Sequence, residues 1–154
     1  MIEEIVYVLL PVHNRRETTE RFLRCLAQQT YPHIQLILVD DGSTDDTSGV
    51  ARKYFPALTL LTGTGDWWWA GSLQQGYKWL KKEARAASDI LLIINDDTEF
   101  EADFVGTRLP PFETDRACCS WRISTASKRA ITWKPGFVSI GKACLLAESR
   151  IRSK

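Results

Sequence analysis

The first two-thirds of the chain alternate between apolar runs and stretches in which apolar side chains recur at helical spacing. The runs are nearly continuous and rich in branched residues, which is typical of strands buried on both faces of a sheet. They cover residues 5–12, 34–39, 58–61 and 90–94. Amphipathic spacing predicts helices over about residues 15–29 and 45–54, and a third after Gly71. This alternation predicts an α/β fold, a doubly wound and mostly parallel sheet with helices on both faces.

Short polar residues indicate where the helices begin. Asn14 is placed to cap the first helix, and Ser43 or Thr44 to cap the second, because such side chains accept hydrogen bonds from the free N–H groups of a first helical turn. Residues 63–71 form a Gly-rich stretch that contains three consecutive tryptophans. We interpret this stretch as a loop that leads into the third helix.

The regular pattern ends near residue 104. Residues 105–154 contain only two weak apolar runs, at 137–140 and 143–146. Residues 1–104 carry 10 Lys and Arg against 16 Asp and Glu, whereas residues 105–154 carry 10 against 3. We therefore predict two parts, residues 1–104 and a basic C-terminal segment at residues 105–154. Two hypotheses stay open for that segment: a truncated or out-of-frame continuation, or a divergent but genuine subdomain.

Length and composition suit one globular domain, with 154 residues of which 44% are hydrophobic and 25% charged. No stretch is apolar for long enough to span a membrane, and no signal peptide is recognisable, so we expect a cytoplasmic protein. The four cysteines show no metal-ligand spacing and predict reduced thiols. The basic segment suggests peripheral association with a membrane. We expect no nucleic-acid partner, because no known binding motif accompanies the basic residues.

Acidic and amide side chains gather where the predicted strands end. These strand ends read Pro11-Val12-His13-Asn14, Asp40-Asp41-Gly42-Ser43 and Asn95-Asp96-Asp97-Thr98. In open α/β sheets, ligands bind at the carboxyl ends of the strands. Four carboxylates at one edge repel each other unless a positive group joins them, and Mg²⁺ or Mn²⁺ would suit their oxygen atoms together with substrate phosphates. One acidic pair alone is ordinarily turn chemistry, but two pairs and a third polar strand end favour a ligand site.

Other phosphate and catalytic motifs fit less well. Gly63-Thr64-Gly65 lacks the third glycine of a dinucleotide fingerprint and does not follow the first strand. The chain has no GxxxxGK[ST] loop and no GxSxG nucleophile elbow. Two interpretations of the tryptophan run stay open: packing against the edge of the sheet, or apolar walls for a base or a sugar.

The segment from Val8 to Thr47 resembles the opening of family 2 glycosyltransferases, which have the GT-A fold. It contains a strand, Pro-x-x-Asn, a helix, Gln-Gln-Thr-Tyr-Pro, a second strand and Asp-Asp-Gly-Ser-Thr-Asp-Asp-Thr. Residues 95–98 are similar to the family's DxD-type motif, and the likeness covers residues 5–104. Trp68-Trp69-Ala70-Gly71 with Gly76 further resembles a rhamnosyltransferase-like subset.

The resemblance implies a nucleotide site on the first two strands. Pro11, Val12 and Asn14 would form part of the nucleotide cradle. Asp40 would accept the N3–H of uracil or thymine in a charge-assisted hydrogen bond, which excludes cytosine. The donor would therefore be a UDP- or dTDP-sugar.

The resemblance also implies a metal. Asp96 would contact the ribose, and Asp97 would bind the Mg²⁺ or Mn²⁺ that bridges the diphosphate and assists its departure. Leu73-Gln74-Gln75-Gly76 stands where many members carry Arg-Asn-x-Gly, so we expect one cationic contact to be missing. No acid after Phe104 lies in a recognisable context, so we assign no catalytic base.

These features predict a metal-dependent, inverting glycosyltransferase that transfers a sugar to a saccharide or lipid-linked acceptor. The alternative is a catalytically incomplete fragment that binds nucleotide sugars without transferase activity.

Overall fold

The computed structural model describes residues 4–83, 89–108, 137–140 and 143–146. Its strands are β1 (Val6–Val12), β2 (Ile34–Asp40), β3 (Thr59–Thr62), β4 (Ile90–Ile94), β5 (Phe137–Ile140) and β6 (Ala143–Leu146). Its helices are α1 (Arg16–Ala27), α2 (Thr47–Tyr54), α3 (Trp68–Glu83) and α4 (Phe104–Arg108). The strands form one sheet in the order β3-β2-β1-β4-β6-β5. The first four are parallel to each other, whereas β6 is antiparallel to both of its neighbours.

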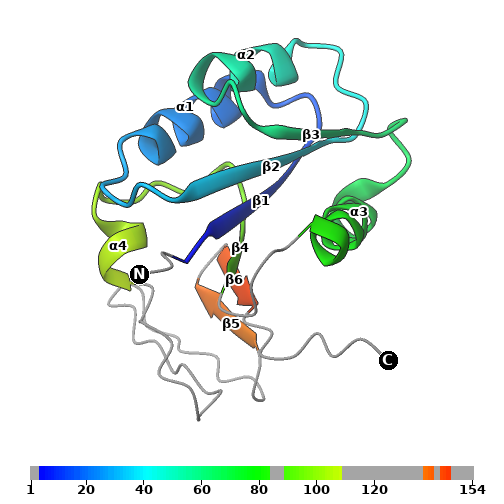
Figure 1. Cartoon of the computed structure of the whole chain (residues 1–154). Helices are drawn as coiled ribbons and strands as arrows, with labels where there is room; N and C mark the ends of the chain where they lie inside the picture. The colour runs from blue at the N-terminus through cyan, green and yellow to red at the C-terminus, as the bar shows by residue number, and fades with distance from the viewer. Residues whose placement is uncertain (1–3, 84–88, 109–136, 141–142, 147–154) are drawn as a thin grey trace, which may run out of the picture.

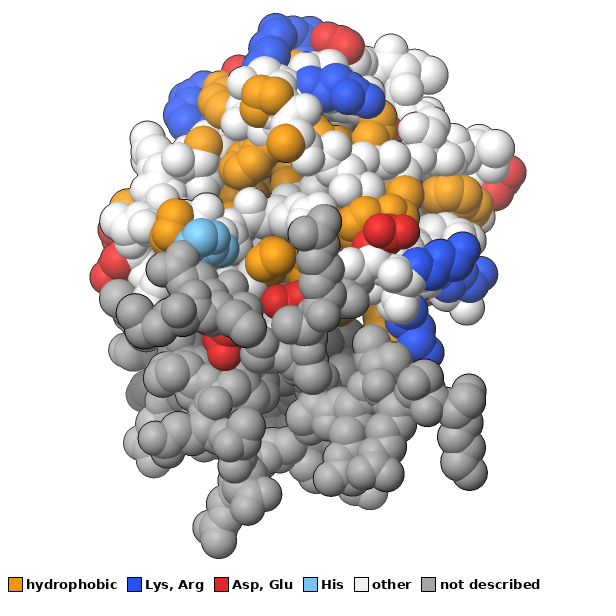
Figure 2. Space-filling view, in the orientation of Figure 1, with side chains coloured by type: hydrophobic (Ala, Val, Ile, Leu, Met, Phe, Trp, Pro, Cys, Tyr) orange, Lys and Arg blue, Asp and Glu red, His pale blue; other side chains and the backbone are white. Residues whose placement is uncertain are grey.

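Helices cover both faces of this sheet, with α1 and α2 on one side and α3 on the other (Figure 1). Alternate residues of β1 divide between the two layers, as the two-residue period of a strand requires. Val8 and Leu10 pack with Phe22 of α1, whereas Leu9 packs with Leu80 of α3. Lys and Arg side chains gather on the outer surfaces of these helices, at the top and right of Figure 2. The predicted α/β architecture is confirmed.

The α3 helix lies close to β1 because Gly76 carries no side chain. A Cβ atom at this position would be 2.2 Å from Cδ1 of Leu9, a residue that is 1% exposed. Glycine therefore sets the distance between the α3 layer and the central strand. It thereby fixes the start of α3 relative to the strand ends.

The expected helix caps were wrong. Asn14 has a left-handed backbone (φ 49°) and does not cap α1; Arg15 is the N-cap residue, without a side-chain cap. A carboxylate from a distant segment caps the helix instead: Asp45 Oδ2 accepts a hydrogen bond from the Arg16 N–H at 2.9 Å. The α1 helix therefore depends on the loop before α2 for part of its N-terminal hydrogen bonding.

The second cap also differs from the expectation. Neither Ser43 nor Thr44 caps α2; Asp45 Oδ1 accepts hydrogen bonds from the Thr47 hydroxyl and, at 3.1 Å, from the Thr47 N–H. Burial raises the pKa of Asp45, but the hydrogen bonds from Thr47 and the Arg16 N–H together bring it below its usual value. Asp45 therefore links the starts of both helices on this face.

The third helix begins earlier than expected. Its first residue is Trp68, so Trp68, Trp69 and Gly71 belong to the helix and not to the preceding loop. The Trp68 and Trp69 side chains consequently project from the first turn of a helix.

Both weak apolar runs of residues 105–154 form strands, and β6 extends the sheet beside β4. The division at residue 105 stays a prediction. The proposed membrane contact and three of the four cysteines fall outside the part of the chain whose side chains are described, and Cys25 is a free thiol. Among the described residues, no helix is long and apolar enough to cross a bilayer.

Candidate functional site

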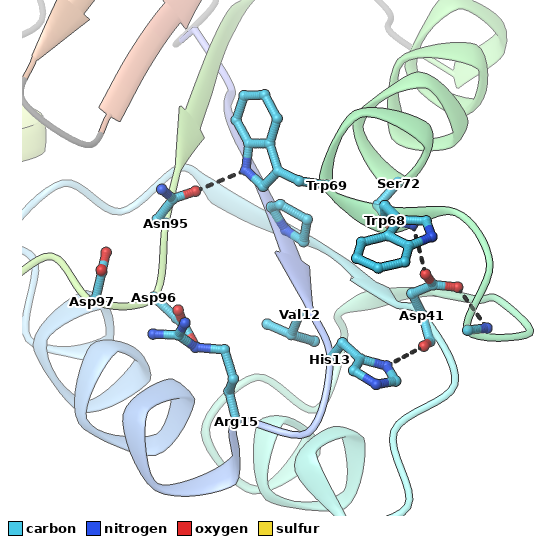
Figure 3. A pocket seen from close by; sticks show the side chains of 12 residues that line it. Val12, His13, Arg15, Asp41, Trp68, Trp69, Ser72, Asn95, Asp96 and Asp97 are labelled. Carbon is cyan, nitrogen blue, oxygen red and sulfur yellow. Dashed lines mark hydrogen bonds and ion pairs between the residues drawn. The ribbon is translucent and has the colours of Figure 1, made fainter.

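A pocket of about 330 Å³ lies at the carboxyl ends of β1, β2 and β4, beside the start of α3 (Figure 3). Its lining residues come from these strand ends and from α3 with the loop before it: Pro11, Val12, His13, Arg15, Asp41, Gly65, Trp68, Trp69, Ser72, Asn95, Asp96 and Asp97. Parallel strands bring these segments together from distant parts of the sequence. The predicted convergence of the three polar strand ends is thus present in the structure.

Asp41 joins the end of β2 to the start of α3. Its carboxylate accepts three backbone hydrogen bonds, from Gly65 at 2.8 Å and from Trp67 and Trp68 at 2.9 Å each. The residue is only 3% exposed. Because three N–H groups compensate its charge, Asp41 is stabilised by the protein itself and acts as a cap for α3 supplied from another element.

Asp96 is paired with a cation. Its Oδ2 accepts hydrogen bonds from Arg15 Nε and from the Thr19 hydroxyl, both at 3.0 Å. Asp96 is 5% exposed, whereas the Arg15 side chain is 46% exposed and borders the pocket (Figure 3). Among the described lining residues, Arg15 is the single Lys or Arg.

The site nevertheless contains a cation that the sequence did not lead us to expect. Residues 73–76 carry none, but Arg15 supplies one from the start of α1. Sequence reasoning missed it because Arg15 was interpreted only as the first residue of a helix. Its position directly after the Pro-x-x-Asn strand end was the available signal.

The tryptophan run divides between the two interpretations left open by the sequence. Trp67 is partly buried and packs with the apolar cluster between α3 and the sheet. Trp68 and Trp69 are exposed and line the pocket. The Trp69 Nε1–H donates a hydrogen bond to Asn95 Oδ1 at 3.0 Å, which connects α3 to the loop after β4 (Figure 3).

His13 connects the ends of β1 and β2. Its Nδ1 lies 2.5 Å from the Asp41 carbonyl oxygen, and its Nε2 lies 3.1 Å from Asn14 Nδ2. A carbonyl oxygen only accepts, so Nδ1 carries the proton and Nε2 accepts from the Asn14 amide. The ring is thereby held at the pocket wall in one tautomer.

Two predicted site residues do not line the pocket. Asn14 Oδ1 accepts from the Thr44 N–H at 2.8 Å, so its amide fastens the turn that follows β2. Asp40 is 4% exposed, and its Oδ1 accepts from the Ser43 N–H at 2.9 Å. Pro11, Val12, Asp96 and Asp97 do line the pocket. The roles expected for all six stay predictions.

Asp97 is the residue expected to bind a divalent metal. Asp97 is exposed at the edge of the pocket, two residues after Asn95. In the described part of the chain, no three His, Cys, Asp or Glu side chains are grouped to hold an ion. Mg²⁺ and Mn²⁺ are often held by one or two carboxylates, with phosphates and water as the remaining ligands. The site therefore fits a metal that arrives with a diphosphate.

Comparison with known proteins identifies the family. The family model described as glycosyl transferase family 2 matches residues 7–151. The chain belongs to glycosyl transferase family 2. The expected family is thereby confirmed, whereas the rhamnosyltransferase-like subset stays a prediction.

Relatives and solved structures agree with this family. Glycosyltransferase AglE of Haloferax volcanii is 37% identical over 58 residues, which are 36% of this chain and 19% of AglE. The mannosyltransferase PcManGT from Pyrobaculum calidifontis, solved with GDP-Man and Mn²⁺, is 26% identical with a TM-score of 0.55, over 67% of this chain and 30% of that one. S. aureus TarS 1-349, solved with UDP-GlcNAc, is 22% identical with a TM-score of 0.56, over 68% of this chain and 30% of that one.

The TarS likeness concerns the fold alone. Together these neighbours confirm the GT-A fold class. The chain spans about a fifth of the length of AglE and about 30% of the two solved chains.

Proposed function

We propose that this chain binds a UDP- or dTDP-sugar in its pocket and is the donor-binding part of an inverting glycosyltransferase. The observation that carries the proposal is the pocket itself, where the Asp96–Arg15 pair and the exposed Asp97 meet at the carboxyl edge of a GT-A sheet. The PcManGT complex with GDP-Man and Mn²⁺ supports a nucleotide-sugar donor and a metal. The acceptor would be a saccharide or a lipid-linked acceptor.

Each polar group then has a separate task. Arg15 holds Asp96 in place and presents its half-exposed guanidinium to the anionic donor. Asp96 contacts the ribose. Asp40 lies beside the pocket lining at the end of β2 and would accept the N3–H of the base through the carboxylate oxygen that Ser43 does not use. Asp97 would hold a Mg²⁺ or Mn²⁺ ion, which when bound stabilises the charge of the leaving nucleoside diphosphate. Pro11 and Val12 form the apolar floor of the nucleotide cradle.

Calorimetry with UDP and dTDP, each with and without Mn²⁺, tests the proposal. The wild type should bind in the presence of Mn²⁺, and Asp97→Ala should weaken that binding at least tenfold. Glu99→Ala is the matched control, because Glu99 is an exposed acid in the same loop that does not line the pocket. Absence of nucleotide binding in the wild type, or an equal loss in both variants, would contradict it.

A second measurement separates an enzyme from a binding fragment. Release of nucleoside diphosphate from a sugar donor, with or without a saccharide acceptor, should be measurable and should decrease in Asp97→Ala. Binding without any turnover would support the incomplete fragment instead.

A further inference from the structure

Two indole rings are exposed at the pocket. Trp68 is 80% exposed and Trp69 is 55% exposed, although both line the cavity. Trp67, by contrast, packs against the apolar cluster beneath α3. Packing of the core therefore explains one tryptophan of the three.

The backbone of Trp68 adopts a conformation that bulky residues rarely take. Its φ angle is 52°, in the left-handed region, and the conformation is held by the hydrogen bond from its N–H to the buried Asp41 carboxylate. Because the Trp68 ring is mostly exposed, it contributes little packing energy to offset this strain. Strained residues of this kind concentrate at ligand sites, so the geometry favours a ligand as the reason for displaying these rings.

The Trp69 ring is fixed in its orientation. Its Nε1–H donates to Asn95 Oδ1 at 3.0 Å, and Asn95 directly precedes Asp96 and Asp97 (Figure 3). The indole is thus braced between α3 and the loop after β4. A ring held in this way loses little side-chain entropy when a ligand packs against it.

The surroundings of Trp69 match the chemistry of a sugar ring. A hexose has faces of C–H groups that pack on an aromatic ring, and hydroxyl groups that donate to amide and carboxylate oxygens. Trp69 offers the aromatic face, and the Asn95 side-chain amide lies beside it in the same pocket, with N–H groups that can donate to a sugar hydroxyl. A flat base would also stack on an indole, but the proposed function places the base at the end of β2 and the diphosphate at Asp97.

We propose that Trp69 forms the binding surface for the sugar ring of the donor. Asn95 is a positioning residue that sets the angle of the indole. This assignment rests on the proposed function, because it uses the diphosphate at Asp97 to place the sugar beside the end of β4.

The test compares nucleotides with and without their sugar. Calorimetry in the presence of Mn²⁺ measures UDP against UDP-glucose and UDP-N-acetylglucosamine, and dTDP against dTDP-glucose. In the wild type, at least one sugar nucleotide should bind more tightly than its parent nucleotide. Trp69→Ala should reduce that added affinity roughly two- to tenfold while UDP and dTDP bind as before. Gln74→Ala is the control, because Gln74 is exposed on the same helix and outside the pocket lining.

Four outcomes would overturn the assignment. Equal losses for UDP and for UDP-sugars in Trp69→Ala would place the ring against the nucleotide. Unchanged affinities in that variant would show that nothing contacts the ring. A wild type that binds each sugar nucleotide no better than its parent would contradict the sugar surface, yet leave the proposed nucleotide binding intact. Absence of UDP and dTDP binding contradicts both proposals.

The positioning role of Asn95 has its own readout. Asn95→Leu removes the acceptor of the indole N–H and should reduce the added affinity for the sugar. Asn95→Asp keeps an acceptor oxygen and should retain that added affinity. Equal behaviour of the two variants would contradict the positioning role.

Discussion

Asp41 shows how a single side chain in this protein serves fold and site together. Its carboxylate accepts hydrogen bonds from three backbone N–H groups of the segment from Gly65 to Trp68, and the residue is almost completely buried. Asp40, the neighbouring acid, makes contacts within its own turn. The two members of the first acidic pair therefore differ in role, which their identical chemistry and adjacent positions did not reveal.

Replacing Asp41 should loosen the start of α3. Asp41→Ala leaves the N–H groups of Gly65, Trp67 and Trp68 without their acceptor, and we expect it to lower the free energy of unfolding by about 1.5–3 kcal/mol, the range for a hydrogen bond to a charged group. Urea denaturation followed by far-UV circular dichroism measures this change. Asp66→Ala is the control, since Asp66 is an exposed acid of the same loop whose carboxylate contacts the Thr64 hydroxyl at 3.2 Å. Equal urea midpoints for the two variants would contradict the role of Asp41 in holding the start of α3.

At the scale of elements, strands were predictable and caps were not. Each buried strand, such as β4 over residues 90–94, is encoded by its own continuous apolar run. The cap of α1 instead comes from Asp45, which lies 29 residues beyond the N–H that it accepts from. A local pattern carries no information about such a partner, so Asn14, the nearest polar residue, was chosen wrongly.

The contact between α3 and β1 also depends on both elements. Gly76→Ala would place its methyl group 2.2 Å from Leu9 Cδ1, and overpacking of this kind should lower the free energy of unfolding by about 1–3 kcal/mol. Gly106→Ala, where the nearest atom would lie at 3.7 Å, should have little effect. Thermal unfolding of both variants provides the measurement.

A double-mutant cycle identifies the cause. Adding Gly76→Ala to a Leu9→Ala background should lower stability by less than it does in the wild type, because the clashing side chain has been shortened. An unchanged effect would show that the loss arises elsewhere.

For the molecule as a whole, the strand ends were predicted to meet, and they do. The pocket that they form also depends on Arg15, Asn95 and Trp69, whose pairings link segments separated by 81 and 26 residues. Residue types at each strand end could be read from the sequence. The partner of each acid could not be read from the sequence, because it is decided by how α1 and α3 pack on the sheet.

The sheet as a whole extends beyond its parallel strands. Deleting residues 137–154 removes β5 and β6 and exposes the backbone of β4, whose residues pair antiparallel with β6. An unprotected edge strand favours association with other chains. We expect the shortened protein to unfold at least about 4 °C lower and to form larger species on size exclusion.

A shorter deletion serves as its control. Removal of residues 147–154 keeps both strands and should change neither property. Monomeric behaviour and unchanged unfolding of the longer deletion would show that β4 does not need β6.

The pairing of β4 with β6 also determines the order of events during synthesis. Residues 90–94 pair with residues 143–146, so the partner of β4 leaves the ribosome about 50 residues after β4 itself. At roughly 5–20 residues per second, the interval lasts approximately 3–10 s. The four parallel strands can assemble during this time, and the nascent chain then carries an open sheet edge at β4 until β6 emerges.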